Sequence, residues 1–270
     1  MSLRIQNNVE AFNAQRQLVS NSDKLGKAME KLSSGYRINR AGDDAAGLAI
    51  SEKLRGQIGG LAQASRNASD AVSMVQTAEG ALNEVHSMLQ RVRELAVQYK
   101  NGTLSTNDRN SIQSEVDQLK AEIERIGAET NFNGIDLLKS ASTTISFQVG
   151  AADTQQITVA TISVGAQVVS TVYALSSVGS QTDIQQIDDA INNISAARAT
   201  FGAVQNRLEH TIANIASYQE NLTASESRIR DADMASEMVA FTKFQILQQA
   251  GTSMLAQANQ APQSVLSLLR

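Results

Sequence analysis

The segment 184–229 constrains the fold more than any other feature, because a mostly apolar set of positions alternates between spacings of three and four without a break. This spacing is the heptad repeat of a coiled coil and places the residues along one side of a helix. A helix of this length is about 70 Å long, and with a single apolar seam it is not stable alone in water. The segment therefore predicts a long helix packed against other helices. Ten of its fourteen seam positions are Ile, Leu or Phe: 184, 187, 191, 194, 198, 201, 205, 208, 212, 215, 219, 222, 226 and 229.

Two other segments carry seams that suit this helix. From Ala45 to about Gln98 the apolar residues lie three, four or seven apart, which predicts a second long helix of about 80 Å. A shorter heptad seam follows at 112–126, after a break at Asn101-Gly102. Only 4% of the residues are aromatic and one is proline, which fits long helices joined by aliphatic side chains. The predicted fold class is mainly α, a long antiparallel helical rod or coiled-coil bundle.

The region near 141–165 has a different pattern. Ile145, Phe147 and Val149 alternate with polar residues, and Ile157 and Val159 do the same. Alternation with β-branched residues predicts strands. We therefore expect a small β-hairpin in this region, beside the helices.

Both ends of the chain have apolar helical patterns with no evident partner within such a bundle. Residues 1–40 and the methionine-rich segment 231–270 each present an apolar face. Unpartnered apolar helices favour self-association. We expect these helices to pair in an assembly, with the following residues as assembly seams: Leu18, Leu25, Met29, Leu32, Phe241, Leu247 and Leu255.

Two adjacent aspartates, Asp43 and Asp44, precede the helix that begins near Ala45. Acidic side chains at that place accept hydrogen bonds from free backbone N–H groups and interact well with the helix dipole. A catalytic or metal-binding pair would need partner residues that the sequence lacks. The two aspartates are predicted to cap the helix.

No other pattern indicates chemistry. The chain has no cysteine and two histidines, neither in a zinc-binding motif, and no glycine-rich phosphate loop follows a strand pattern. We predict no catalytic, cofactor-binding or metal-binding residues and no enzyme activity. The formal net charge of −4 argues against nucleic acid as a partner, and no segment is apolar enough to span a membrane. Binding to a membrane surface is not favoured, because the polar faces of the terminal helices are rich in Gln, Asn and Ser and not in Lys and Arg. The N-terminus lacks the apolar region of a cleaved secretory signal.

Several long motifs, in order, carry a family resemblance. The stretches SSGYRINRAGDDAAGLAISEKLRGQI (33–58), LQRVRELAVQ (89–98) and SRIRDADMASEM (227–238), with the tail 246–270, resemble bacterial flagellin, the subunit of the flagellar filament. The resemblance covers about the first 140 and the last 90 residues. Only about 165–181 stands where larger members of this family insert outer domains, so the chain looks like a minimal form with little or no outer domain.

The resemblance implies a domain organisation and a function. Residues 1–42 and 231–270 would form a terminal-helix domain in the filament core, and 43–230 a helical rod domain with the hairpin. The chain would polymerise with other copies into the extracellular filament used for swimming motility. It would be secreted unfolded through the flagellar type III export system.

The resemblance also implies partners. These are an export chaperone on the C-terminal helix, the filament cap and the hook-junction proteins. Flagellins are also recognised by an innate immune receptor, and the positions here that match its contact face are Arg91, Leu95 and Glu115.

The nearest alternative is a hook–filament junction protein, which has similar terminal helices. Such a protein is expected to differ in its middle region and to match less well at 89–98 and 206–238. An enzyme carried in an outer domain is excluded by the short insert. A coiled-coil scaffold that stays inside the cell would differ from a filament subunit in where the protein is found.

Overall fold

The computed structural model describes residues 8–140, 144–165, 168 and 182–268. The described residues form two compact units. We call residues 1–56 with 221–270 the terminal unit and residues 57–220 the middle unit. The predicted boundaries at 42/43 and 230/231 concern domains of an assembled filament and stay a prediction. Most of 165–181, where an outer domain would be inserted, lies outside the described residues.

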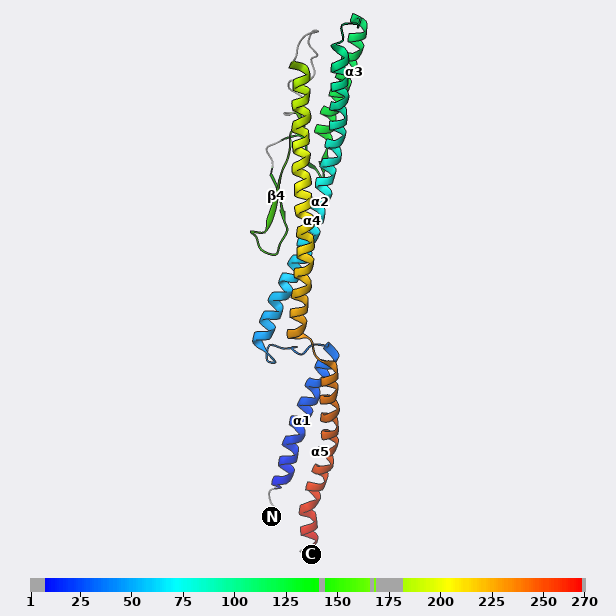
Figure 1. Ribbon diagram of the computed structural model, residues 1–270. Helices are drawn as coiled ribbons and strands as arrows, with labels where there is room; N and C mark the ends of the chain where they lie inside the picture. The colour runs from blue at the N-terminus through cyan, green and yellow to red at the C-terminus, as the bar shows by residue number, and fades with distance from the viewer. Residues whose placement is uncertain (1–7, 141–143, 166–167, 169–181, 269–270) are drawn as a thin grey trace. The chain divides into compact units, whose positions relative to one another are not determined.

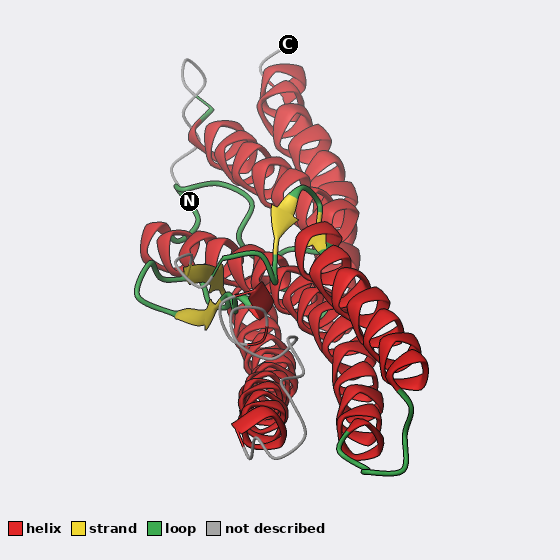
Figure 2. Cartoon of the chain, turned by 90° about the horizontal axis from the view of Figure 1, so that it is seen from above, coloured by secondary structure: helices red, strands yellow, loops and turns green. Residues whose placement is uncertain are grey.

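Five helices and four short strands make up these units (Figure 1). The helices are α1 (Val9–Ser34), α2 (Ala45–Tyr99), α3 (Thr106–Glu129), α4 (Thr182–Arg230) and α5 (Met234–Leu268). The strands are β1 (Asn131–Phe132), β2 (Ile135–Asp136), β3 (Thr144–Gln148) and β4 (Gln156–Ala160). Figure 2 shows how far helix dominates over strand. The mainly α class with a small hairpin is confirmed.

In the middle unit, α2 and α4 run antiparallel. Three ion pairs establish the direction, because as the residue number rises along α2 it falls along α4. Glu79 faces Arg198 at 3.8 Å, Arg93 donates to Asp188 at 2.6 Å, and Lys100 lies 3.5 Å from Asp183. The helix α3 returns along α2 and begins with a capping box, in which Ser105 and Asp108 each accept a hydrogen bond from the other's backbone N–H.

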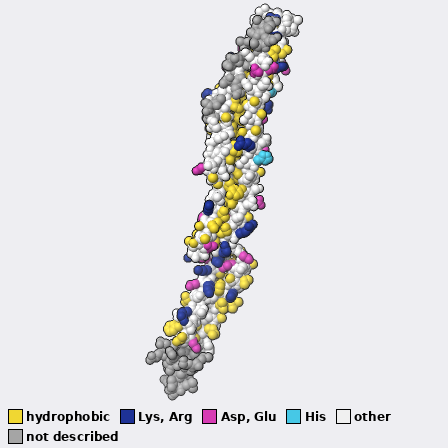
Figure 3. Space-filling view, turned by 60° about the vertical axis from the view of Figure 1, so that its left-hand side comes forward, with side chains coloured by type: hydrophobic (Ala, Val, Ile, Leu, Met, Phe, Trp, Pro, Cys, Tyr) yellow, Lys and Arg dark blue, Asp and Glu magenta, His cyan; other side chains and the backbone are white. Residues whose placement is uncertain are grey.

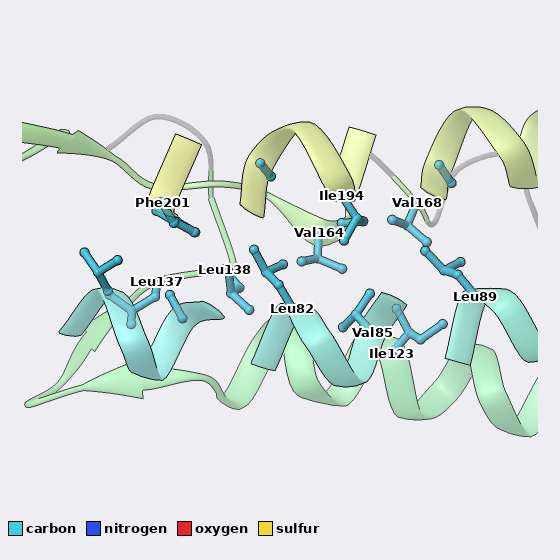
Figure 4. Close-up of a cluster of buried hydrophobic side chains, with 14 of the residues drawn as sticks. Leu82, Val85, Leu89, Ile123, Leu137, Leu138, Val164, Val168, Ile194 and Phe201 are labelled. Carbon is cyan, nitrogen blue, oxygen red and sulfur yellow. The ribbon is translucent and has the colours of Figure 1, made fainter. Parts of the chain in front are cut away.

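One hydrophobic core holds this unit together. Figure 4 shows Leu82, Val85 and Leu89 of α2 directed toward α4 and α3, with Ile194 and Phe201 opposite them. The side chains of Leu82, Val85 and Leu89 have no exposed surface. This core contains most of the aliphatic residues predicted for the seams of 45–98 and 112–126.

The buried stripe of α4 differs from the predicted seam in one respect. The half of the seam at 187, 194, 201, 208 and 215 is buried as expected. The other buried positions lie one residue earlier than predicted, at Ala190, Ala197 and Val204, while Arg198 and Gln205 are only partly covered. The helix α4 contacts more than one neighbour, so it buries a broader stripe than the seam of a two-helix coiled coil. Small residues fill the edge of that stripe.

The predicted hairpin is present as β3 and β4, which pair antiparallel with Phe147 opposite Ile157. Ile157 and Val159 are buried in the middle-unit core. The side-chain amide of Asn67 on α2 donates to the backbone oxygen of Gln148, 3.1 Å away. The alternation of apolar residues therefore marks the face that packs on the helices, as expected for a half-buried sheet.

In the terminal unit, α1 and α5 lie side by side and antiparallel (Figure 1). The Asn8 side-chain amide donates to the carbonyl of Ala258 at 2.7 Å, and that of Asn21 donates to the carbonyl of Phe244 at 2.8 Å. The two terminal helices therefore pair within one chain.

Candidate assembly surface

The pairing of α1 with α5 leaves an open groove along one side of the two helices. Its volume is about 680 Å³. A glycine makes the close approach possible, since a Cβ at Gly251 would lie 2.9 Å from Cδ1 of Leu18. We call this the terminal groove. It is lined by Glu10, Asn13, Ala14, Gln17, Leu18 and Asn21 of α1 and by Leu247, Ala250, Gly251, Met254, Gln257 and Ala258 of α5.

The predicted assembly residues, of which Leu18 and Leu247 line this groove, divide into two groups by exposure. Leu18, Leu25, Leu32, Phe241 and Leu255 are half-buried in the single chain. Met29 and Leu247 are exposed, at 55% and 46%. The first group is largely occupied within the chain, whereas the second remains free for another molecule.

A further set of exposed apolar side chains on the same helices was not among the predicted assembly residues, although those of α5 belong to the methionine-rich segment 231–270. Figure 3 shows hydrophobic side chains at the surface of this helix pair, among charged ones. A group of neighbouring exposed apolar side chains marks an interaction site more often than single scattered ones do. A helical-wheel plot of each terminal segment would have shown these apolar residues beside the predicted seam positions. They are Val9, Phe12, Val19, Met234, Met238, Val239, Ile246 and Met254.

The junction that connects α1 to α2 also connects α4 to α5. The helix α1 ends at Gly35, whose positive φ of 75° suits a glycine. Beyond it, the backbone N–H of Arg37 donates to the carbonyl of Arg230 at 2.7 Å, and that of Ala232 donates to the carbonyl of Gly35 at 2.9 Å. These hydrogen bonds join the segment between α1 and α2 to the segment between α4 and α5.

The Arg230 side chain completes this junction. Its guanidinium donates to Glu52 at 2.7 Å and lies 4.8 Å from the centre of the Tyr36 ring. The hydrogen bond from Arg230 holds the pKa of the Glu52 carboxyl below its ordinary value. The end of α4 is thus tied both to the first turns of α2 and to the segment after α1.

Asp44 caps the helix α2 as predicted, whereas Asp43 instead binds N–H groups of the loop before that helix, which corrects the prediction for Asp43. The Asp44 carboxylate accepts from the N–H of Gly47 at 2.8 Å, in the first turn of α2. The Asp43 carboxylate accepts from the N–H groups of Arg40 at 3.0 Å and Asn39 at 3.2 Å. Their position is explained by local backbone chemistry, and neither needs a ligand.

Acid is expected to release the loop held by Asp43. Hydrogen bonds from the N–H groups of Arg40 and Asn39 lower the pKa of Asp43, so its stabilising contribution is complete above the unfolded value of about 4. The contribution is lost as the pH falls through the lowered folded-state pKa. Amide NMR shifts of Asn39 and Arg40 should titrate at that pH and should lose the transition in Asp43→Asn. A midpoint at or above the ordinary aspartate value would contradict this assignment.

The three predicted receptor-facing residues differ in their exposure to solvent. Arg91 on α2 donates two hydrogen bonds to Glu115 on α3, at 2.9 and 2.8 Å, and both side chains are about half exposed. The hydrogen bonds to Glu115, and after them its negative charge, raise the pKa of Arg91. Leu95 is 1% exposed and lies in the middle-unit core. In the subunit it is a core residue and not a contact residue for a partner, which corrects the expectation for that position.

No metal-binding arrangement occurs among the described residues, since no group of three or more His, Cys, Asp or Glu side chains comes together there. Within the same part of the chain, no helix is both long and apolar enough to cross a membrane. Among the described residues of the terminal unit, the exposed apolar side chains of α1 and α5 are the feature that suits a protein partner.

Comparison with known proteins points to one family. Residues 5–143 match the bacterial flagellin N-terminal helical region, and residues 184–269 match the bacterial flagellin C-terminal helical region. The chain is similar to flagellin of Halalkalibacterium halodurans, with 53% identity over 98% of this chain and 99% of that one. It is 50% identical to flagellin of Bacillus subtilis, over 99% of this chain and 100% of that one. The crystal structure of Bacillus cereus flagellin covers 60% of this chain and 94% of its own, with 36% identity and a TM-score of 0.52.

Proposed function

Because this chain belongs to the bacterial flagellin family and is a structural subunit of the extracellular flagellar filament, we propose that the α1–α5 surface joins each subunit to its neighbours. The family is one of structural proteins, which agrees with the prediction of no enzyme activity. The relatives are similar over their full length and are named flagellin, so nothing favours the alternative of a hook–filament junction protein. The terminal-helix domain is then proposed to be 1–42 with 231–270, and the rod domain 43–230.

One observation carries this proposal. The helices α1 and α5 pack against each other through half-buried leucines. Met29, Leu247 and Met254 nevertheless remain exposed, at 55%, 46% and 65%. Full burial of one such side chain is worth about 1.5–3 kcal/mol relative to full exposure. Burial of the remaining exposed area against a second copy would therefore stabilise the assembly at each of these positions. Polymerisation is the function that uses this surface.

A charge placed on this surface should stop filament growth. Leu247→Glu puts a carboxylate on a side chain that is exposed in the subunit, so the folded subunit tolerates it, but a neighbour could bury it only at a high desolvation cost. We expect purified Leu247→Glu to fail to extend sheared filament seeds in electron microscopy. The same-site control Leu247→Met keeps the apolar surface and should extend seeds like the natural chain. Normal growth of the Glu variant would place the subunit contacts elsewhere.

Further partners are proposed on the family resemblance. An export chaperone would bind the C-terminal helix, α5, whose exposed apolar residues are the surface to be shielded before assembly. The chain would pass unfolded through the type III export system, which the absence of cysteine favours because no disulfide can form. The filament cap and hook-junction proteins would contact the ends of the polymer, which serves swimming motility.

The innate immune receptor is proposed to contact the exposed Arg91–Glu115 pair. This pair presents a guanidinium and a carboxylate side by side on α2 and α3. Arg91→Glu would place two negative side chains together and should weaken binding of the purified receptor to the free subunit. Unchanged binding would remove this pair from the interface.

A further inference from the structure

The methionines of this chain fall into two classes by exposure. In the middle unit, Met74 is 4% exposed and Met88 is partly buried against the core. Those of α1 and α5 are open: Met29 is 55% exposed, Met234 47%, Met238 49% and Met254 65%. Met1 lies outside the described residues. The four open methionines all stand on the proposed polymerisation surface.

The chain has no cysteine, so methionine supplies all of its sulfur. A thioether is oxidised by peroxides in a two-electron step: the sulfur gains an oxygen atom from hydrogen peroxide and becomes a sulfoxide, the O–O bond breaks, and the second oxygen leaves as water. The product is a polar, chiral side chain in place of a flexible apolar one. The reaction favours sulfur that solvent can reach, which in the described chain means the four open methionines.

We propose that Met29, Met234, Met238 and Met254 form an oxidation site on the free subunit, and that their conversion to sulfoxides blocks its addition to a filament. This inference rests on the proposed role of the α1–α5 surface in polymerisation. The oxidant is a peroxide, and the modification is reversible by methionine sulfoxide reductases of the two epimer specificities.

The placement of the four residues explains why the block would be effective. Met254 lines the terminal groove beside Leu247 and Gly251. Met234 and Met238 lie in the first turns of α5, whereas Met254 lies near the middle of that helix. Modification therefore reaches two separate parts of the surface. A sulfoxide oxygen is a hydrogen-bond acceptor, and burying it in an apolar contact without a donor is unfavourable.

Burial of the α1–α5 surface in a filament should also protect its methionines from oxidation. In an assembled filament these side chains would lie between subunits, so peroxide would reach them more slowly than in the free subunit. Oxidation would thus act on subunits before assembly and spare subunits already in place. Met74 and Met88 provide an internal reference, because their exposure does not depend on the α1–α5 surface.

The test uses the full chain and hydrogen peroxide. Free subunits are treated, the sulfoxide at each methionine is quantified by mass spectrometry, and the critical concentration for extension of seeds is measured. We expect sulfoxide at the four open methionines and a rise of about tenfold or more in the critical concentration, which corresponds to about 1.4 kcal/mol per added subunit. Treatment with the reductases and a dithiol reductant, which supplies the two electrons and leaves as a disulfide while the sulfoxide oxygen leaves as water, should restore the original value. Assembled filaments under the same peroxide should show slower oxidation at these four positions.

Two matched variants separate this cause from general damage. The quadruple variant Met29→Leu, Met234→Leu, Met238→Leu, Met254→Leu keeps apolar side chains of similar volume and should polymerise equally well before and after peroxide. The variant Met74→Leu, Met88→Leu keeps the four open methionines and should remain sensitive.

Three results would overturn the inference: oxidised natural subunits that extend seeds normally, a quadruple variant that stays sensitive, or equal oxidation rates in subunit and filament. Failure of the proposed function itself is distinguishable, because untreated natural subunits and Leu247→Glu subunits would then extend seeds alike.

Discussion

Replacement of Leu89 by alanine should lower the free energy of unfolding of the middle unit by about 3 kcal/mol. Leu89 has no exposed surface and points from α2 toward α4 (Figure 4). The substitution removes buried apolar area and leaves a cavity, and helices tied together by ion pairs such as Arg93–Asp188 cannot easily close over it. Urea unfolding of the full chain, followed by circular dichroism at 222 nm, measures the change.

Val97→Ala is the matched control for this result. Val97 lies on the same helix but is 51% exposed, so its truncation should change the unfolding free energy by less than about 0.5 kcal/mol. A loss at Leu89 no larger than that of the control would mean that the core relaxes freely around the cavity. The described packing would then not be the main source of stability.

Replacement of Ile38 by alanine should lower the free energy of local opening of the terminal-unit junction by about 3 kcal/mol. Ile38 is 1% exposed, and its Cδ1 lies 2.8 Å from the place where a Cβ would stand at Gly47, over the first turn of α2. Without this side chain, the segment between α1 and α2 loses its apolar anchor. The amides of Arg37 and Ala232, which bond across the junction, should exchange their hydrogens about a hundredfold faster.

Hydrogen exchange with mass spectrometry on the free subunit reports this directly. Ile50→Ala removes the same atoms from a residue that is 51% exposed and should leave exchange at the junction within about twofold of the natural chain. Unchanged protection of Arg37 in the Ile38 variant would show that the backbone bonds alone hold the junction.

These results bear on how a filament subunit of this kind is divided. The middle unit has a continuous aliphatic core of its own, so it is stabilised within the single chain. The terminal unit depends on one helix pair, with Leu18 and Leu255 only half-buried and Met254 largely exposed. A helix pair that encloses so little apolar area is stabilised most by burying its remaining apolar surface against neighbouring subunits. We therefore expect the chemistry of the α1–α5 surface to control growth, and the middle-unit core to control stability.

The sequence by itself determined the helices and the hairpin, because their signals are periodic and local. The unbroken spacing through 184–229 predicted α4, the alternation at Ile145, Phe147 and Val149 predicted β3, and the position of Asp44 before Ala45 predicted a cap that Gly47 completes. In each case the residues within one or two turns, or on one strand, decide the conformation. The family resemblance could likewise be found from motifs alone.

Only the tertiary structure decided which apolar residues stay open. Periodicity cannot distinguish Leu95, which is buried in the core, from Leu247, which is exposed, because both lie on apolar faces of helices. It also placed half of the α4 stripe one residue late, since the width of a buried stripe depends on how many neighbours the helix contacts. The pairing of α1 with α5 joins the two ends of the chain, and that contact separates half-buried residues such as Leu18 and Leu255 from exposed ones such as Leu247 and Met254. Burial depends on contacts between segments far apart in the sequence, and no local pattern contains that information.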